Sequence, residues 1–300
     1  MNKYIISSDV RISEKSVTAD SLDFHGNRDW KKPTIEALFH ENAKLSEARY
    51  DGWQKPIGQF SSQSMSVVNK IKKPDYPHNE AIDLPKPTRI EIESLSKILK
   101  QRESRLSGAD EPLTLSRLSA VLSVALGAFE RGEIELEGEH DQDTAWYRRP
   151  YPSPGGLYPI ETYVVATSVD GLESGVYYYV PEDHILRVVD RWDDNRRASS
   201  LFFDNGKVED ADAALCMTCA IARATAKYGT RGFRFALIEA GHVGQNVQLA
   251  ATAAGIAALP YGGYNDYKMD DAFGIDGFNE SVVATTLLRG AVEDTSQEDK

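Results

Sequence analysis

Residues 160–189 read IETYVVATSVDGLESGVYYYVPEDHILRVV. β-branched and aromatic side chains fill three runs of this stretch, and short polar connections separate the runs. Each run has the length of a strand and is bounded by residues that favour turns. The stretch therefore predicts a meander of strands, at Ile160–Thr167, Gly175–Val180 and Ile185–Val189.

Apolar patterns on either side of this meander add two strands and three helices. The added strands are apolar runs at Ala213–Ile221 and Ser281–Leu288. Helices are predicted at Ile90–Lys100, from Thr114 to Gly132 at the latest, and at Phe233–Ala258. Because the helices and strands do not alternate as βαβ units, we expect an α+β layered fold and not a doubly wound one.

Each predicted helix has its own signal. Thr88 followed by Glu91 has the spacing of a capping box, which marks the start of the first helix. An apolar stripe from Leu115 to Phe129 is typical of a helix packed into a core. In the third helix small and aliphatic residues recur without interruption, so we expect it to be nearly fully buried, with Gly255 close to its end.

The composition of the chain narrows the possible functions. Its 300 residues are 41% hydrophobic and 27% charged, which suits one large or two modest globular domains. The net charge of -12 argues against a nucleic-acid partner, because such partners bind proteins with an excess of basic residues. The sequence shows no apolar run of the ~18 residues that a membrane span needs, and its two cysteines provide no disulfide framework. We expect a soluble, cytoplasmic protein.

The chain divides into two parts near a proline-rich segment. Residues 1–87 have sparse apolar periodicity and end in Leu84-Pro85-Lys86-Pro87, which does not fit a regular element. We interpret 1–87 as an N-terminal extension, a possible docking region for a peptide or a partner, and 88–300 as the main domain. The acidic stretch at 133–143 is expected to be a solvated loop.

Two spacings resemble metal sites but lack the remaining ligands. Cys216 and Cys219 would need a second pair to bind zinc, and on a strand residues three apart face opposite sides. Glu239 and His242 have the Glu-x-x-His spacing of di-iron bundles, but the sequence contains no second such motif. We predict two buried structural thiols and no metal.

The long helix carries an unusual polar cluster. Glu239, His242, Gln245 and Asn246 fall within two turns of a mostly apolar helix, and Glu239, His242 and Asn246 are predicted to share one face. Buried polar groups need partners. They either bond to neighbouring backbone or face a polar ligand or a subunit contact, and the sequence does not decide between these alternatives.

Three separated segments have the chemistry of ligand contacts. Arg102, Ser104 and Arg105 follow the first helix, and guanidinium groups with a hydroxyl suit a phosphate. Adjacent glycines at 155–156 and 262–263 allow backbone amides to approach a flat or anionic ligand. Together the segments favour one cofactor site assembled from distant parts of the chain.

The same segments carry a resemblance to a known family. The order Arg-x-Ser-Arg, Ser-x-Gly-Gly-Leu-Tyr-Pro-Ile-Glu, Lys-Tyr-Gly-x-Arg-Gly-Phe-Arg-Phe-x-Leu-Ile-Glu-Ala-Gly-His-x-x-Gln-Asn and Leu-Pro-x-Gly-Gly resembles the SagB-type dehydrogenases. These belong to the nitroreductase-like flavoproteins and include the azoline oxidases. The resemblance covers about residues 88–290 and is most specific at 153–161 and 227–246.

The resemblance implies a three-layer fold, with a central antiparallel sheet flanked by helices, and a homodimer that binds FMN at its interface. It assigns the phosphate and the polar edge of the ring to Arg102, Ser104 and Arg105, with Arg289 near the phosphate. It assigns one side of the isoalloxazine to Ser153, Gly155, Gly156 and Leu157. The other side is assigned to Leu259, Pro260, Gly262 and Gly263.

The resemblance also implies a catalytic pair, Lys227 and Tyr228, since azoline oxidases use a Lys-Tyr pair in substrate deprotonation. Chemistry gives an independent reason, because turning an azoline into an azole removes a proton from carbon and a hydride to flavin. Lysine is a suitable base when it is partly desolvated, and a neighbouring tyrosine is able to share the proton.

We therefore expect an FMN-dependent dehydrogenase that oxidises thiazoline or oxazoline rings of a ribosomal peptide, with a peptide substrate and a possible cyclodehydratase complex as partners. One alternative is an NAD(P)H-dependent nitro, ene or dehydroamino-acid reductase on the same fold. Another is a flavin-free scaffold subunit of a modification complex.

Overall fold

The computed structural model describes residues 35–59, 68, 76, 79–86, 95–107, 109–133, 145–193, 196–203 and 209–292. The start of the first predicted helix and nearly all of the predicted acidic loop lie outside these ranges. From Leu95 onward the first helix is observed, as α4 (Leu95–Gln101).

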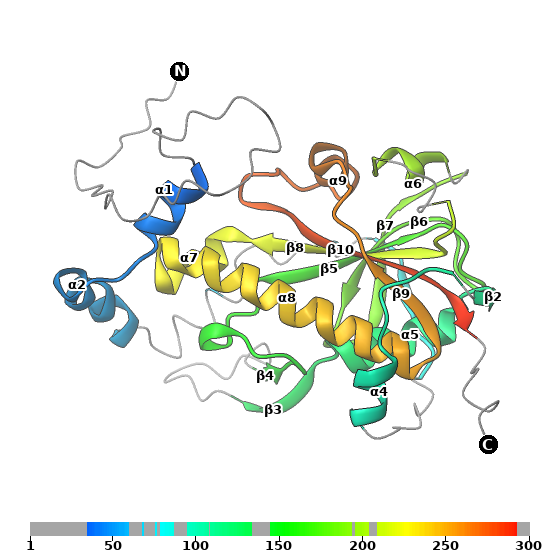
Figure 1. Ribbon diagram of the computed structural model, residues 1–300, viewed down its shortest axis with the longest axis horizontal. Helices are drawn as coiled ribbons and strands as arrows, with labels where there is room; N and C mark the ends of the chain where they lie inside the picture. The colour runs from blue at the N-terminus through cyan, green and yellow to red at the C-terminus, as the bar shows by residue number, and fades with distance from the viewer. Residues whose placement is uncertain are drawn as a thin grey trace.

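An antiparallel sheet of eight strands forms the centre of the molecule (Figure 1). The three strands of the predicted meander are β5 (Ile160–Ala166), β6 (Gly175–Val180) and β7 (Ile185–Arg191), and they pair in sequence order. The full order is β1-β7-β6-β5-β8-β10-β2, with β9 paired to β10. The other strands are β1 (Ala81–Asp83), β2 (Ala109–Glu111), β8 (Ala213–Ala220), β9 (Ile256–Pro260) and β10 (Glu280–Val292), and β3 (Phe129–Glu133) pairs with β4 (Ala145–Arg148) in a separate ribbon.

Helices cover both faces of the sheet. On one face α5 (Leu115–Leu126) and α8 (Thr230–Ala253) pack over the larger hydrophobic cluster. On the other face α6 (Arg196–Ser200) and α9 (Asp266–Ala272) pack over a second cluster. Figure 1 shows these two helix layers on opposite sides of the strands. The arrangement confirms the predicted α+β fold with a central antiparallel sheet.

Strand β8 explains why the fold needs both layers. All eight of its residues are buried, and alternation along the strand sends successive side chains to opposite faces. Cys219 joins the first cluster and Cys216 the second, so the two thiols lie on opposite faces of the sheet, as predicted. Burial raises the pKa of both thiols, that of Cys219 to about 12.

Two helix boundaries differ from the predictions. The helix capped by Thr114 ends at Leu126, and Phe129 is an exposed residue of β3 and not part of the buried stripe. At Gly127 the backbone leaves the helix, and a Cβ there would lie 2.4 Å from the Ser123 carbonyl oxygen. The prediction of a helix to Ala258 is also wrong, because the chain turns at Gly255, where φ is 65°, and enters β9.

Burial of α8 is one-sided within a single chain. Its inward face is made of small and aliphatic residues plus Glu239, whereas Leu237 and Ile238 are 41% and 54% exposed. The expectation of a nearly fully buried helix is therefore not met by one chain alone. Across the described ranges, none of the helices combines the length and the apolar character that crossing a bilayer requires.

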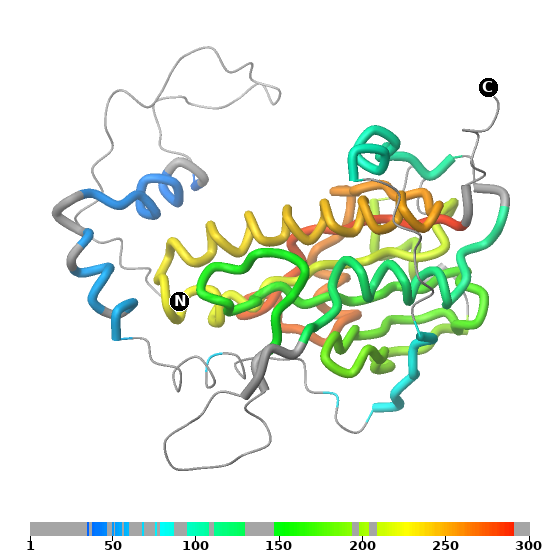
Figure 2. The backbone as a smooth tube through the Cα atoms, turned by 90° about the horizontal axis from the view of Figure 1, so that it is seen from below, coloured from blue at the N-terminus to red at the C-terminus, as the bar shows by residue number. Residues whose placement is uncertain are grey.

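The N-terminal part also contributes to the folded core. Strand β1 pairs with β7 at the edge of the sheet, so the sheet includes residues that precede the boundary we predict at 87. Two helices, α1 (Ile35–Asn42) and α2 (Glu47–Gly58), lie beside α7 (Ile221–Tyr228) and the first turns of α8. Figure 2 shows them beyond the N-terminal end of α8.

Candidate functional site

A tight turn before β5 forms one wall of the site. The 3-10 turn η2 (Pro154–Gly156) needs positive φ angles at Gly155 (65°) and Gly156 (67°), which glycine adopts without strain. The Ser153 hydroxyl accepts a hydrogen bond from the Tyr158 N–H at 2.9 Å, and the Ser153 carbonyl accepts one from Gly156 at 3.0 Å. Ser153 thus shapes the turn that the glycines make possible.

Helix α7 brings Lys227 and Tyr228 directly against this turn. A Cβ placed on Gly155 would lie 2.6 Å from the Tyr228 hydroxyl and 3.1 Å from the Lys227 Nζ. The Lys227 Nζ also lies 5.6 Å from the centroid of the Tyr228 ring. The structure therefore brings together the glycine turn and the Lys-Tyr pair, which sequence analysis singled out separately.

A small pocket lies between the turn, α7 and α8. It has room for about one water molecule. Burial raises the pKa of Tyr228, so its hydroxyl keeps its proton near neutral pH. The lining residues are Pro154, Leu157, Pro159, Ala224, Tyr228, Gly232, Phe235, Ala236 and Glu239.

Glu239 is the acidic residue of this pocket. Its side chain is fully buried, and neither carboxyl oxygen has a hydrogen-bond partner of ordinary geometry among the described residues. Burial raises the pKa of Glu239 to about 8, although the nearby Ser153 hydroxyl and Ile160 N–H lower it in part. At neutral pH the group is therefore mostly a neutral carboxylic acid.

The other polar residues of α8 behave differently. His242 and Gln245 are exposed, and Asn246 donates a hydrogen bond to the Pro150 carbonyl at 3.3 Å. The predicted common face of Glu239, His242 and Asn246 is therefore not observed as one buried surface. Within the described ranges, no group of three or more His, Cys, Asp and Glu side chains is placed to hold a metal ion.

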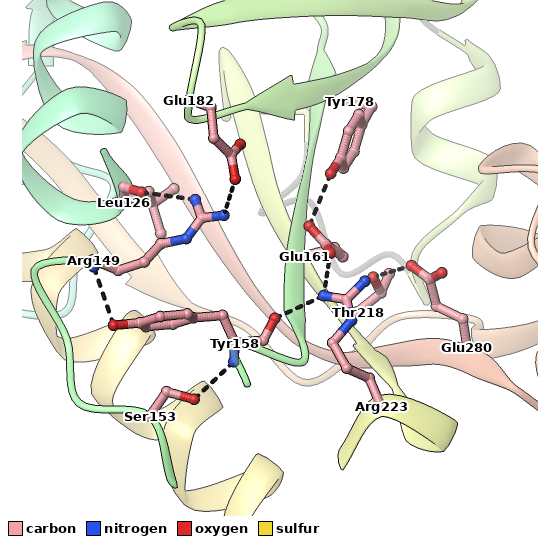
Figure 3. Close-up of polar contacts among 10 residues, drawn as sticks. All are labelled: Leu126, Arg149, Ser153, Tyr158, Glu161, Tyr178, Glu182, Thr218, Arg223 and Glu280. Carbon is pink, nitrogen blue, oxygen red and sulfur yellow. Dashed lines mark hydrogen bonds and ion pairs between the residues drawn. The ribbon is translucent and has the colours of Figure 1, made fainter. Parts of the chain in front are cut away.

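A buried ion pair anchors α7 beneath the turn (Figure 3). The Arg223 guanidinium donates to the Tyr158 carbonyl at 2.8 Å and to the Glu161 carboxylate at 2.5 Å. Glu161 also accepts a hydrogen bond from the Tyr178 hydroxyl at 2.9 Å. Since Arg223 lies one helical turn before Lys227, this ion pair fixes the helix that carries the Lys-Tyr pair.

A second ion pair supports the other end of the turn. Arg149 is buried and bonds to Glu182 at 3.1 Å, while its backbone N–H donates to the Tyr158 hydroxyl at 3.3 Å. Tyr158 itself has a φ of 44°, an uncommon conformation for a residue with a side chain. Hydrogen bonds that Tyr158 donates to Ser153 and accepts from Arg149 and Arg223 together hold it there.

The residues proposed for the phosphate lie elsewhere, at the C-terminal end of α8. Arg102 donates to the Gln248 side-chain carbonyl at 3.0 Å and lies 3.2 Å from the Ser104 hydroxyl. Ser104 pairs with Ala258 of β9, and the Arg105 N–H bonds to the Ala258 carbonyl at 3.1 Å. The Arg105 guanidinium is partly exposed and lies 3.5 Å from Glu103.

Strand β9 connects this cluster to the remaining predicted residues. Arg289 pairs with Ala257, one residue from Ala258, but its guanidinium faces Asp210 at 3.7 Å. Leu259 and Pro260 continue β9 along β10, and Gly262 and Gly263 follow after Tyr261. The structure thus brings Arg102, Ser104 and the backbone of Arg289 to one region of β9.

The two clusters lie on opposite sides of α8. Glu239 and Gln248 are nine residues apart, which is about 14 Å along the helix and two and a half turns around it. The charged donors and hydroxyl of the second cluster fit a phosphate, and the glycine turn fits the close approach of a flat ring. Within one chain, however, α8 separates them.

Several residues of the site are not predicted from the sequence. Arg223 and Gln248 belong to no motif, although an arginine three residues after the mostly apolar strand β8 is a signal of a buried ion pair. Glu161 belongs to the quoted motif, but its role as an anchor needed the structure. Trp53, which contacts Tyr228, lies in a region whose periodicity predicts little.

Comparison with known proteins identifies relatives of this chain. The nitroreductase family model matches residues 99–288. Over 182 residues the chain is 35% identical to a candidate nitroreductase, MJ1384 of Methanocaldococcus jannaschii, covering 60% of this chain and 84% of that protein. It is 32% identical to the microcin B17-processing protein McbC of Escherichia coli, over 45% of this chain and 51% of that protein.

Solved structures share the fold. A structure of a candidate nitroreductase from Anabaena variabilis superposes with a TM-score of 0.61 at 23% identity, over 86% of this chain and 46% of that one. A chain of the E. coli microcin synthetase McbBCD complex with bound truncated pro-MccB17 superposes with a TM-score of 0.52 at 22% identity. That match covers 84% of this chain and 99% of the other.

The family match spans more than half of the chain, and the aligned part of MJ1384 covers most of that protein. The α+β fold with its central antiparallel sheet agrees with this match. The chain belongs to the nitroreductase family.

Proposed function

We propose that this chain is an FMN-dependent dehydrogenase that oxidises thiazoline or oxazoline rings of a ribosomally synthesised peptide to thiazoles or oxazoles. The observation that carries the proposal is the contact of Lys227 and Tyr228 with the Gly155 turn. This contact joins a proton-transfer pair to a surface that admits a flat ring. The similarity to McbC, a peptide-processing protein, gives further support.

The two clusters suit the two ends of FMN. Arg102, Ser104 and Arg105, with Arg289 nearby, would hold the phosphate, and Ser153 and Gly155–Leu157 would lie along the ring. Leu259, Pro260, Gly262 and Gly263 would approach the ring from the other side. When bound, FMN supplies the hydride acceptor that an azoline oxidation requires.

The Lys-Tyr pair would manage the proton. Lys227 would accept the proton from one ring C–H bond, and the hydride from the other C–H bond would go to the acceptor that FMN supplies when bound. Tyr228 is protonated near neutral pH because burial raises its pKa, so its hydroxyl is a hydrogen-bond donor beside Lys227. Pro154, Leu157 and Phe235 line the small pocket beside Tyr228 and would limit the access of water to its hydroxyl.

The peptide substrate and a cyclodehydratase are the partners that this chemistry calls for, because an azoline must be formed before it is oxidised. The similarity of the fold to a chain of the McbBCD complex is consistent with a place in such an assembly.

A reductase is the second candidate, because MJ1384 is described as a nitroreductase and matches over most of its length. In that case NAD(P)H would reduce the bound flavin faster than any azoline peptide does. Single-turnover flavin reduction with each donor separates the two candidates.

The test of the leading proposal uses Lys227→Ala and Tyr228→Phe. Both variants should retain FMN and lose azole formation by ~10²-fold or more, the usual size of a general-base contribution. Reduction by dithionite serves as the control for an intact flavin. Wild-type rates of azole formation in both variants would refute the assignment, and loss of flavin in both would make the pair structural.

A further inference from the structure

Helix α2 contacts the residue that we place at the reacting end of the site. The Trp53 indole N–H donates a hydrogen bond to the Tyr228 carbonyl at 3.2 Å. The two rings are also stacked, with centroids 6.3 Å apart and planes inclined by 29°. Both contacts join residues that are far apart in the sequence.

The hydrogen bond meets a need of α7. Tyr228 is the last residue of that helix, and the final carbonyls of a helix have no partner within it. At Gly229 the backbone reverses with a φ of 59°, so the helix does not continue past Tyr228. Trp53 therefore supplies a donor at the point where α7 ends.

The contacts also fix the direction of the Tyr228 ring. Trp53 stacks on the ring, and Phe235 of α8 meets it edge to face, with centroids 5.4 Å apart. Held in this way, the Tyr228 hydroxyl lies at the Gly155 turn. A ring without Trp53 on one side would be free to turn away from Gly155.

Three further contacts hold α1 and the connection between α1 and α2 against α8. Arg231 donates to the Ala43 carbonyl at 2.8 Å, and Arg234 donates to the His40 carbonyl at 3.0 Å. Phe39 packs edge to face on Phe233, with centroids 5.8 Å apart. These contacts hold α1 and its connection to α2 beside the first turns of α8, next to the contact of α2 with Tyr228.

We propose that α1 and α2 complete the active site, with Trp53 as the positioning residue that holds Tyr228 against the Gly155 turn. The proposal deepens the proposed function and rests on it for the identity of the reaction. It assigns the N-terminal part of the chain a role inside the site. Docking of a peptide or partner by that region stays a separate prediction.

Trp53→Ala, Trp53→Phe and the matched control Gln54→Ala test the proposal in the full-length, FMN-loaded protein. Gln54 is exposed on the same helix, so its variant controls for changes to α2 itself. We expect Trp53→Ala to lower kcat for azole formation by roughly 10- to 100-fold, since small misplacements of catalytic groups have effects of this size. KM should change little, Trp53→Phe should recover most of the rate, and Gln54→Ala should match the wild type.

A second readout does not depend on the reaction. The Tyr228 hydroxyl is titrated by NMR on tyrosine labelled with ¹³C, and its signal is assigned by its loss in Tyr228→Phe. Trp53→Ala uncovers the ring, so the Tyr228 pKa should fall toward that of a free tyrosine. The charged groups around Tyr228 stay the same in all variants, namely Lys227 beside the ring, Arg231 against Phe235, and Glu239 in the pocket.

The two readouts distinguish the possible failures. Wild-type kcat in Trp53→Ala would overturn the positioning role, whether or not the Tyr228 titration shifts. If the wild-type protein oxidises no azoline, the proposed function fails, and the titration then decides the inference alone. An unchanged titration in Trp53→Ala would overturn the contact itself.

Discussion

Glu239 combines three properties that rarely occur together in one side chain. It is fully buried, it lines the pocket beside Tyr228, and its carboxyl oxygens have no ordinary hydrogen-bond partner among the described residues. Burial without full compensation disfavours the charged form, which is why its pKa rises to about 8. Such a residue lowers the free energy of unfolding at every pH at which its carboxyl would be ionised in the unfolded chain.

The pH dependence of stability follows from this shift. The unfolded carboxyl loses its proton near pH 4.5 and the folded one near pH 8, so the unfolded state binds fewer protons in this window. The contribution of Glu239 to stability should therefore fall by about 1.4 kcal/mol per pH unit between these values and stay constant above them. Glu239→Gln should remove this slope.

Urea unfolding of the wild type and of Glu239→Gln from pH 4 to pH 9 measures the effect. The difference between the two proteins isolates Glu239 from Arg149, Arg223 and every other titrating group. Parallel curves across the whole range would show that Glu239 keeps an ordinary pKa in the folded protein.

Arg102 allows a test of the phosphate cluster. If its guanidinium makes a charge-assisted contact with the FMN phosphate, Arg102→Ala should weaken FMN binding by ~1.5–3 kcal/mol. Fluorescence titration of the flavin-free protein with FMN gives the affinity. Lys100→Ala is the matched control, because it removes an exposed positive charge two residues away. Equal FMN affinities in Arg102→Ala and Lys100→Ala would show that Arg102 does not contact the FMN phosphate.

At the scale of single residues, the sequence predicts those features of the site that depend only on neighbouring residues in the chain. The glycine pair at 155–156 requires positive φ angles, and this need is visible in the sequence. The partners of Arg102 and of Tyr228 are not visible, because Gln248 and Trp53 approach them from distant parts of the chain. Contacts of this kind depend on how the elements pack.

At the scale of elements, a buried ion pair helps to fix the position of α7. Arg223 and Glu161 are 2% and 4% exposed, and their ion pair joins α7 to β5. Removing one member of a buried pair leaves the other charge uncompensated. Arg223→Met should therefore destabilise the protein by about 3–5 kcal/mol.

The double variant Arg223→Met/Glu161→Leu should lose less stability than Arg223→Met, because it leaves no isolated charge. Arg191→Ala is the control, because it removes a surface ion pair with Glu80 and Glu173. This variant should lose at most about 1 kcal/mol of stability. Thermal or urea unfolding of the four proteins measures these differences. A double variant less stable than Arg223→Met would contradict this account.

Element boundaries show what composition does and does not determine. The strands at 160–166, 175–180 and 185–191 match their predictions because β-branched residues and turn residues alternate clearly there. Phe129 continues an apolar helical stripe in the sequence, yet the helix ends before it, at Gly127. Beyond Gly255 the apolar residues suit a helix or a buried strand equally, and pairing with β10 selects the strand.

For the whole molecule, the separation of the two clusters by α8 is the central fact. The Gly155 turn with Tyr228 lies on one side of the helix and Arg102 with Ser104 on the other, so one chain does not bring them together around a single FMN. The helices α4 and α5, which both pack against α8, and α8 itself also expose apolar side chains. These are Leu95, Leu99, Val124, Leu237 and Ile238.

We predict a homodimer, which would account for both observations. A second copy packed on these helices would cover the apolar side chains, and its Gly155 turn would complete the site that begins at Arg102. Light scattering of the FMN-loaded protein should therefore give twice the chain mass. A fully active monomer would contradict the dimer.

Mixed dimers decide whether each site takes residues from both chains. Homodimers of Lys227→Ala should be inactive. Homodimers of Arg102→Ala should also be inactive when FMN is subsaturating. In a mixed dimer of the two variants, one site would have Arg102 from one chain and Lys227 from the other, and the second site would lack both. Purified heterodimers, selected with two different affinity tags, should thus regain about half of the wild-type activity per dimer, as a shared interface site requires. Heterodimers no more active than the parent variants would place Arg102 and Lys227 in the same site within one chain, and the dimer would then need another explanation.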